Sequence, residues 1–317
     1  MMDIPHEGSV SRLGRSTLRT LLYFDIFSYP LTLPEIQKFS SINILTLNEL
    51  QQELHELEKT GLIFKFGYFY CLKDDEAMVA RRVKGNKEAE KYLPMAQQRA
   101  TFISRFPFVR GVMASGSLSK GYMDEKSDLD FFVITEPRRL WIARTLFVMY
   151  RKFFIPRRRH KEFCANYFIA ADQLDIEEKN IFTATELATL IPLCNQEMYF
   201  HLLEANGWMR DFLPNFRAKE SEGLGAPTDF WLKNVLEKIA RLFFPTQVNA
   251  LIMQATLLHL KRKYQKLFDA SEFSLALKTQ PHVSKVHLGN NQKRVLTHLQ
   301  EKIKEFETKL SRSLTHA

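Results

Sequence analysis

Two groups of residues with clear chemical potential lie close together in the middle of this 317-residue chain. The first is the glycine turn Gly-Ser-Leu-Ser-Lys-Gly at 116–121, and the second is Ser-Asp-Leu-Asp at 127–130. Apolar runs at 109–114 and 131–134 flank the two groups. This order predicts a strand, a glycine turn with a short helix, and a second strand that begins with two carboxylates.

The carboxylates are Asp128 and Asp130, which are two residues apart and therefore point to the same face if they lie on a strand. Like charges at this separation repel each other unless a cation lies between them. Mg²⁺ suits such a pair because it prefers hard oxygen ligands and binds through one or two carboxylates together with substrate phosphates. The pair therefore predicts a site for one or two magnesium ions and a phosphorylated substrate.

The glycine turn has the properties of a phosphate-binding segment. Gly116 and Gly121 allow the backbone to approach a phosphate closely, and Ser117 can donate its hydroxyl. Lys120 adds a positive charge, and the N-terminus of the short helix favours an anion. We expect these residues, together with Ser127, to hold the phosphates beside the metal.

The segment 109–134 resembles the nucleotidyltransferase superfamily that includes DNA polymerase β and the minimal bacterial nucleotidyltransferases. The family pattern is Gly-Ser, three residues and Gly, followed by Ser-Asp-hydrophobic-Asp-hydrophobic. Ser117 precedes Asp128 by eleven residues, which is the family's usual gap, and Lys120 stands where the family often has Arg. The resemblance implies a mixed sheet with helices and a metal-dependent transfer of a nucleoside monophosphate from a nucleoside triphosphate to a hydroxyl.

In that family a third acid on a neighbouring strand completes the metal site. Here the third predicted strand, 163–170, carries Asn166 at that place, and an amide can ligate a metal but cannot act as a base. Three alternatives therefore stay open. The enzyme works with two carboxylates, or the domain binds nucleotide without turning it over, or the third acid comes from elsewhere, such as Glu162, Asp172 or Asp124.

Residues 1–75 resemble a winged helix-turn-helix. The sequence predicts three helices, the second and third opened by capping-box patterns at 32–35 and 46–49, and then a hairpin over 62–72. The third helix is acidic, whereas DNA affinity depends mainly on cations that meet phosphates. We expect protein contact or intramolecular packing, with duplex DNA binding as the alternative, resting on basic residues outside that helix: Arg12, Arg15, Arg19 and Lys65.

The predicted fold class is α+β, with a winged-helix module, a central nucleotidyltransferase-type mixed sheet with helices, and a C-terminal all-helical region. The expected divisions are 1–75, a connecting helix at 76–107, the core at 108–193 and the helical domain at 194–317. Within them we expect further helices at 140–154, about 175–193 and about 195–205. Long helical segments are expected at about 229–268 and 290–310.

The net charge of the chain is +9, and the segment 138–161 contains nine Lys or Arg and no acidic residue. Such a segment can attract phosphates or a nucleic-acid backbone, or form a basic amphipathic helix at a membrane surface. We expect the loop at 157–161 to bind a phosphate-rich ligand. The three cysteines have no disulfide or zinc spacing, which indicates a reducing cytoplasm, and we predict neither a signal peptide nor a transmembrane segment.

The sequence therefore predicts a cytoplasmic, magnesium-dependent nucleotidyltransferase. Its partners are a nucleoside triphosphate and an acceptor that is a small molecule, an RNA or a protein. The alternatives are a catalytically degenerate nucleotide-binding regulator and a winged-helix interaction or DNA-binding protein.

Overall fold

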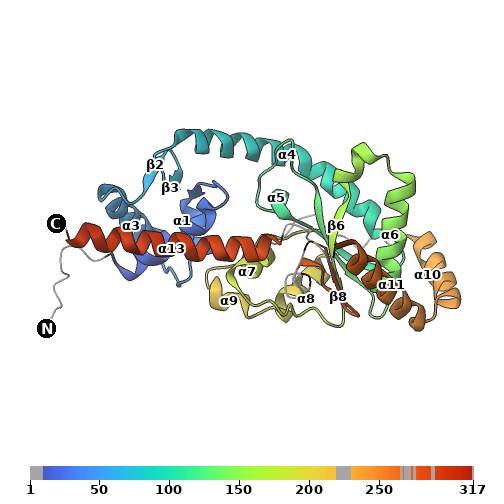
Figure 1. Cartoon of the computed structure of the whole chain (residues 1–317). Coiled ribbons are helices and arrows are strands. Elements are labelled where there is room, and N and C mark those ends of the chain that lie inside the picture. The colour runs from blue at the N-terminus through green and yellow to red at the C-terminus, as the bar shows by residue number, and fades with distance from the viewer. Residues whose placement is uncertain are drawn as a thin grey trace.

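The computed structural model describes residues 10–218, 230–264, 267, 273, 276–286 and 290–315. The protein is a mixed α+β molecule in which a small N-terminal module and a six-stranded sheet lie at opposite ends (Figure 1). Two long helices, α4 (Glu76–Ser104) and α13 (Asn291–Thr315), run between these ends. A helix was predicted over 76–107, and α4 lies in this range.

The N-terminal module contains three helices and a three-stranded antiparallel sheet with the order β1-β3-β2. The helices and strands are α1 (Arg12–Asp25), α2 (Leu33–Phe39), α3 (Leu47–Lys59), β1 (Leu31–Thr32), β2 (Phe64–Phe66) and β3 (Phe69–Cys71). Glu35 accepts a hydrogen bond of 2.9 Å from the backbone N–H of Thr32, as the capping box requires. The predicted helices and hairpin are confirmed, and residues 1–9 of the expected module lie outside the described residues.

The larger sheet is mixed and has the strand order β7-β4-β5-β6-β9-β8. Its strands are β4 (Val109–Ser115), β5 (Asp130–Thr135), β6 (Cys164–Ala170), β7 (Ile191–Cys194), β8 (Thr279–Gln280) and β9 (Val283–Lys285). β5 and β6 are parallel and are joined by α6 (Leu140–Phe154) and the 3₁₀ helix η1 (Arg157–Glu162). All other pairs are antiparallel. The three strands predicted around the motif are thus confirmed.

Helices cover both faces of this sheet, because alternate residues of its strands are apolar on each side. Phe131 and Val133 of β5 face the layer that contains α4, α6 and α11 (Thr246–Tyr264). Phe132 and Ile134 face the layer of α7 (Ile181–Thr189), α8 (Gln196–Ala205) and α9 (Met209–Phe212). Asp130 belongs to the second face by the same alternation.

Two predictions about the second half of the chain were wrong. The C-terminal region is not all-helical, because the short hairpin β8–β9 extends the sheet at β6. These two strands contain too few residues for the alternation of apolar and polar side chains to be recognised in the sequence. The helical segment expected over about 229–268 contains two helices, α10 (Trp231–Phe243) and α11, which are separated at Pro245, a residue that lacks a backbone N–H. The helix expected at 175–193 is the shorter α7, and β7 follows it across the expected boundary at 193.

Among the described residues, no helix is long and apolar enough to cross a membrane.

Candidate functional site

The glycine turn and the acid pair meet at one end of the sheet. Ser115, the last residue of β4, pairs with Asp130, the first residue of β5, and Asp130 pairs with Cys164 on the other side. Gly116 follows with a φ of +65°, and a Cβ at this position would lie 2.3 Å from Oδ2 of Asp130. Only glycine therefore allows the turn, which continues into α5 (Gly116–Ser119), to pass so close to the carboxylate.

Asp130 lies half-buried among other carboxylates. Burial raises its pKa to about 7, with further contributions from the negative charges of Asp128 and Glu186, while Lys120 and a hydrogen bond from Asn166 act in the opposite direction. Asp128, just before β5, is exposed. The two predicted acids are thus brought within electrostatic reach of each other, and a bound cation would be favoured there.

Asn166 contacts the predicted acid directly. Its side-chain amide donates a hydrogen bond of 2.7 Å to Oδ1 of Asp130. The pairing of β5 with β6 shifts register between Phe131 and Phe132, so Asn166 lies at a bulge. Bulges re-aim side chains next to functional sites, and this bulge brings Asn166 to the face of the sheet that carries Asp130.

Lys120 approaches the site from the glycine turn and is held by an acid that the sequence analysis missed. Its Nζ lies 2.7 Å from Oε1 of Glu186 and donates a hydrogen bond of 3.2 Å to the backbone carbonyl of Gly116. Glu186 is the only charged residue of the otherwise apolar or uncharged helix α7. A lone acid within such a helix was the signal that could have identified it.

Cys164 is a second neighbour that the sequence analysis missed. Its thiol donates a hydrogen bond of 3.6 Å to Oδ2 of Asp128. Burial, followed by the charges of Asp128 and Asp130, raises the pKa of this thiol to about 12. The thiol is therefore protonated at neutral pH and acts as a hydrogen-bond donor to the acid pair.

The remaining predicted residues are more loosely connected to the acids. Ser127 donates a hydrogen bond of 2.7 Å to Oδ1 of Asp124 and so closes a turn that leads into β5. Ser117 is half-buried, and its backbone carbonyl accepts hydrogen bonds of 3.1 Å from the backbone N–H groups of Lys120 and Tyr122. Gly121 has a φ of +71°, and its carbonyl accepts a hydrogen bond from Asn86 of α4.

None of the three candidate third acids completes a triad with Asp128 and Asp130. Glu162 forms ion pairs of 2.8 Å with Arg99 and 3.0 Å with Arg159. Asp124 is engaged with Ser127, and Asp172 lies past the other end of β6. Within the described ranges, no group of three or more His, Cys, Asp or Glu side chains is arranged to hold a metal ion.

The part of the basic segment predicted as a loop, 157–161, lies at the same end of the sheet as the acid pair. The backbone N–H of Leu129 donates a hydrogen bond of 2.8 Å to the carbonyl of Lys161. The segment forms the 3₁₀ helix η1 instead of the predicted loop, because Pro156 starts it and Glu162 neutralises Arg159. Arg157 and Arg158 are exposed and have no hydrogen bond or ion pair with any residue that the structure describes.

A cavity of about 350 Å³ lies at the opposite end of the sheet, beyond the last residue of β6. Its lining includes Arg138, Ala170, Asp172, Asn249 and His282. The acid pair lies at the first residues of β5 and β6, so this cavity is not part of the candidate site.

The donors at the acid pair fit Mg²⁺ in their chemistry. Asp128 and Asp130 supply hard anionic oxygens, and Asn166 holds the Asp130 carboxylate through its amide nitrogen. Two carboxylates leave room for the phosphate oxygens and waters that magnesium usually retains. Comparisons with protein-family models, curated proteins and solved structures found no match for this chain.

Proposed function

We propose that this protein is a magnesium-dependent nucleotidyltransferase that moves a nucleoside monophosphate from a nucleoside triphosphate to a hydroxyl acceptor. The observation that carries this proposal is the contact of Gly116 with the carboxylate of Asp130. It joins a turn suited to phosphate with a pair of acids suited to a metal, and nucleotidyl transfer needs both within one site.

In this proposal Asp128 and Asp130 hold the metal, which neutralises the charge of the triphosphate when it is bound. Asn166 fixes the orientation of the Asp130 carboxylate through its 2.7 Å hydrogen bond. The backbone at Gly116 and Gly121, with the hydroxyls of Ser117 and Ser127, lies along the phosphates. Lys120 adds a positive charge beside Gly116, positioned by Glu186.

The acceptor is a small molecule, an RNA or a protein, and the exposed cations of η1 favour one that carries phosphate. A direct test incubates the purified protein with Mg²⁺, each labelled nucleoside triphosphate in turn, and a cell extract. We expect label to move to one class of acceptor and pyrophosphate to be released. The double variant Asp128→Asn/Asp130→Asn should lose both signals and keep its fold.

The matched control for this experiment is Asp172→Asn, because Asp172 is an exposed acid at the opposite end of the sheet. It should transfer label as well as the wild type does. Unchanged binding of magnesium and ATP by the double variant would show that the site is assigned to the wrong residues.

One observation favours a second function, that of a nucleotide-binding regulator without turnover. Asn166 replaces the expected third carboxylate, and no other acid in the described part of the chain takes its place. A regulator would bind the nucleotide in the presence of Mg²⁺ but release no pyrophosphate with any acceptor. The transfer experiment therefore separates the two functions.

For the N-terminal module we propose intramolecular or protein contacts in preference to duplex DNA. The exposed side of α3 carries Glu49, Glu56 and Glu58, and α1 packs against α13. In a mobility-shift experiment at about 150 mM salt, the whole chain should form no complex with duplex DNA below micromolar protein, weaker than specific DNA-binding domains reach. A sequence-dependent complex at nanomolar protein would identify a DNA-binding function instead.

A further inference from the structure

Helix α10 is amphipathic, but its polar face is the one turned toward the protein. At 100° per residue, Lys233, Glu237, Ala240 and Arg241 fall on one side of the helix. The opposite side is entirely apolar and consists of Trp231, Leu232, Val235, Leu236, Ile239, Leu242 and Phe243. A surface helix normally buries its apolar side, so this orientation needs an explanation.

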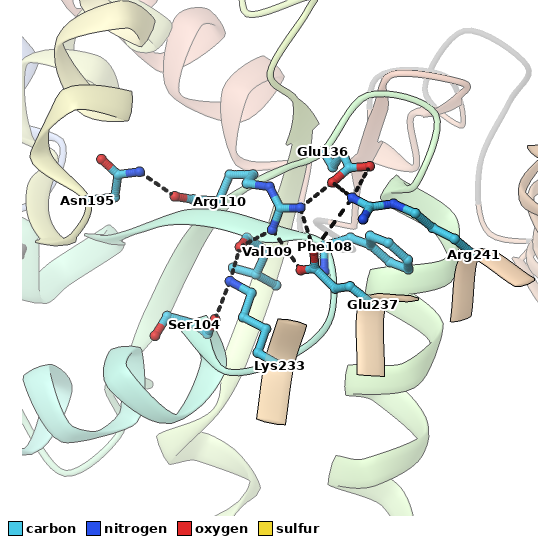
Figure 2. Close-up of polar contacts among 9 residues, drawn as sticks. All are labelled: Ser104, Phe108, Val109, Arg110, Glu136, Asn195, Lys233, Glu237 and Arg241. Atoms are coloured by element: carbon cyan, nitrogen blue, oxygen red, sulfur yellow. Dashed lines mark hydrogen bonds and ion pairs between the residues drawn. The ribbon is translucent and has the colours of Figure 1, made fainter. Parts of the chain in front are cut away.

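Polar contacts hold the helix in this orientation (Figure 2). Lys233 donates hydrogen bonds of 2.9 and 2.6 Å to the carbonyls of Ser104 and Val109. Glu237 accepts hydrogen bonds of 2.8 Å at each of its carboxylate oxygens from the guanidinium of Arg110. These contacts join the polar face of α10 to the end of α4 and to the sheet strand β4.

The pairing continues beyond Glu237. Glu237 also accepts a hydrogen bond of 2.7 Å from the backbone N–H of Phe108. Arg241 forms an ion pair of 2.8 Å with Glu136, which also pairs with Arg110. Glu237 is buried, so these polar contacts fix the orientation of the helix, and turning α10 over would break the ion pairs of Glu237 with Arg110 and of Arg241 with Glu136.

The apolar face that results is large and exposed. Trp231 is 71% exposed, Leu242 is 80% exposed and Phe243 is 70% exposed. On the neighbouring helix α11, Leu251 and Leu258 are exposed as well. An exposed apolar helix face of this kind marks a site of interaction with a protein or a membrane.

The charges around this face indicate what binds it. The segment 230–264 contains one acidic residue, Glu237, which is buried against Arg110. Its basic residues are Lys238, Lys261, Arg262 and Lys263, together with Lys233 and Arg241, which are already held by the contacts described above. A second copy of the same chain would bring these cations against each other, whereas an anionic bilayer complements them. Aromatic and aliphatic residues on one side of a helix, with only cations flanking them, are typical of helices that lie in a membrane interface.

We propose that α10 and the start of α11 form a docking surface for an anionic lipid bilayer, with Trp231, Leu242 and Phe243 inserted at the headgroup level. The helix lies in the plane of the interface and does not span the bilayer. This inference rests on the polar contacts that fix the orientation of α10, and it does not depend on the function proposed for the acid pair.

The test is co-sedimentation of the whole chain with vesicles of phosphatidylcholine that contain about 30 mol % phosphatidylglycerol. The wild type should bind these vesicles, should bind pure phosphatidylcholine vesicles at least about 10-fold more weakly, and should be released by high salt. The triple variant Trp231→Ser/Leu242→Ser/Phe243→Ser should bind the anionic vesicles at least about 10-fold more weakly than the wild type.

Two further variants make the test specific. The double variant Leu45→Ser/Tyr68→Ser removes equally exposed apolar side chains, 79% and 86% exposed, from the N-terminal module and should bind as the wild type does. The tryptophan fluorescence of the wild type should shift to the blue with anionic vesicles. Trp231→Phe should keep the binding and lose the shift, because Trp141 is buried and Trp208 is partly buried and hydrogen-bonded to Asn206, away from α10.

Two results would overturn the proposal. Failure of the wild type to bind anionic vesicles would exclude a membrane-docking surface. Self-association in analytical ultracentrifugation that the triple variant abolishes, with equal vesicle binding by both proteins, would identify the face as an interface between copies of this chain.

Discussion

The side-chain amide of Asn166 donates a 2.7 Å hydrogen bond to Oδ1 of Asp130 across a bulge between two parallel strands. This contact stabilises the ionised form of a half-buried carboxylate, as the downward contribution of Asn166 to the Asp130 pKa shows. An aspartate at 166 would replace that donor with a second negative charge. The effect of a substitution at position 166 on the stability of the protein should therefore depend on whether a metal is bound.

We expect Asn166→Asp to lower the free energy of unfolding by about 1–3 kcal/mol in EDTA, because a buried hydrogen bond becomes a carboxylate–carboxylate repulsion. With Mg²⁺ the same variant should recover more thermal stability than the wild type gains, because three carboxylates then face the metal. Thermal unfolding in EDTA and in Mg²⁺ measures both effects. Asn166→Ala is the control, since it removes the donor without adding charge. If Mg²⁺ does not change the melting temperature of Asn166→Asp, no metal binds at this place.

Gly116 provides a second test of the site. Gly116→Ala should lower the free energy of unfolding by about 2–4 kcal/mol, because alanine is strained at a φ of +65° and its Cβ would lie 2.3 Å from Oδ2 of Asp130. Gly67 separates the two causes, since its φ is +61° and a Cβ there would meet nothing within 4 Å. Gly67→Ala should cost only about 1 kcal/mol by thermal unfolding. Equal losses in the two variants would mean that the turn does not press against the carboxylate.

Much of the fold around the site followed from local patterns. The apolar runs on either side of the motif became β4 and β5, and the capping box at Thr32 is present. The motif itself brought Gly116 and Asp130 together because both are at the ends of strands that pair.

Other features depend on contacts that no local pattern records. Glu186 reaches Lys120 across 66 residues of sequence, and β9 pairs with β6 from more than a hundred residues away. In α10 the periodicity identifies an apolar face but does not say which face is buried. Arg110 of β4 determines which face is buried, because it donates a hydrogen bond to Glu237 on the polar face of α10.

The pKa of Asp130 predicts a pH dependence of stability in the metal-free protein. The folded chain holds this proton up to a pH of about 7, whereas the unfolded chain releases it near 3.8. Between these values the native state binds more protons, so the free energy of unfolding falls as the pH rises through this range. Asp130→Asn removes this contribution, and the asparagine can still accept the hydrogen bond from Asn166.

In EDTA, the stability of Asp130→Asn relative to the wild type should therefore increase from pH 5 to pH 8, by about 1–3 kcal/mol. Urea unfolding at the two pH values measures the difference. Asp172→Asn should show no such trend, since its carboxylate is exposed. A constant difference between Asp130→Asn and the wild type would show that Asp130 is ionised at both pH values.

The exposed cations of η1 supply the last prediction. Arg157 and Arg158 are exposed at the end of the sheet that carries Asp128, whereas Arg159 is paired with Glu162. We expect Arg157→Gln/Arg158→Gln to weaken the binding of a nucleoside triphosphate or a phosphate-rich acceptor about 3- to 30-fold at low salt, because two cations no longer attract the phosphates. For the same reason, the affinity of the variant should depend less steeply on salt concentration. The melting temperature should stay within error of the wild type, since neither side chain pairs with any residue that the structure describes.

Arg159→Gln is the matched control for that variant. It should lower thermal stability slightly through the loss of its ion pair with Glu162, and change the salt slope of binding less than the double variant does. Titrations of labelled nucleotide at several salt concentrations give both the affinity and the slope. An unchanged slope for Arg157→Gln/Arg158→Gln would mean that the ligand's phosphates do not reach η1, and the basic segment would then be a solvated surface beside the site.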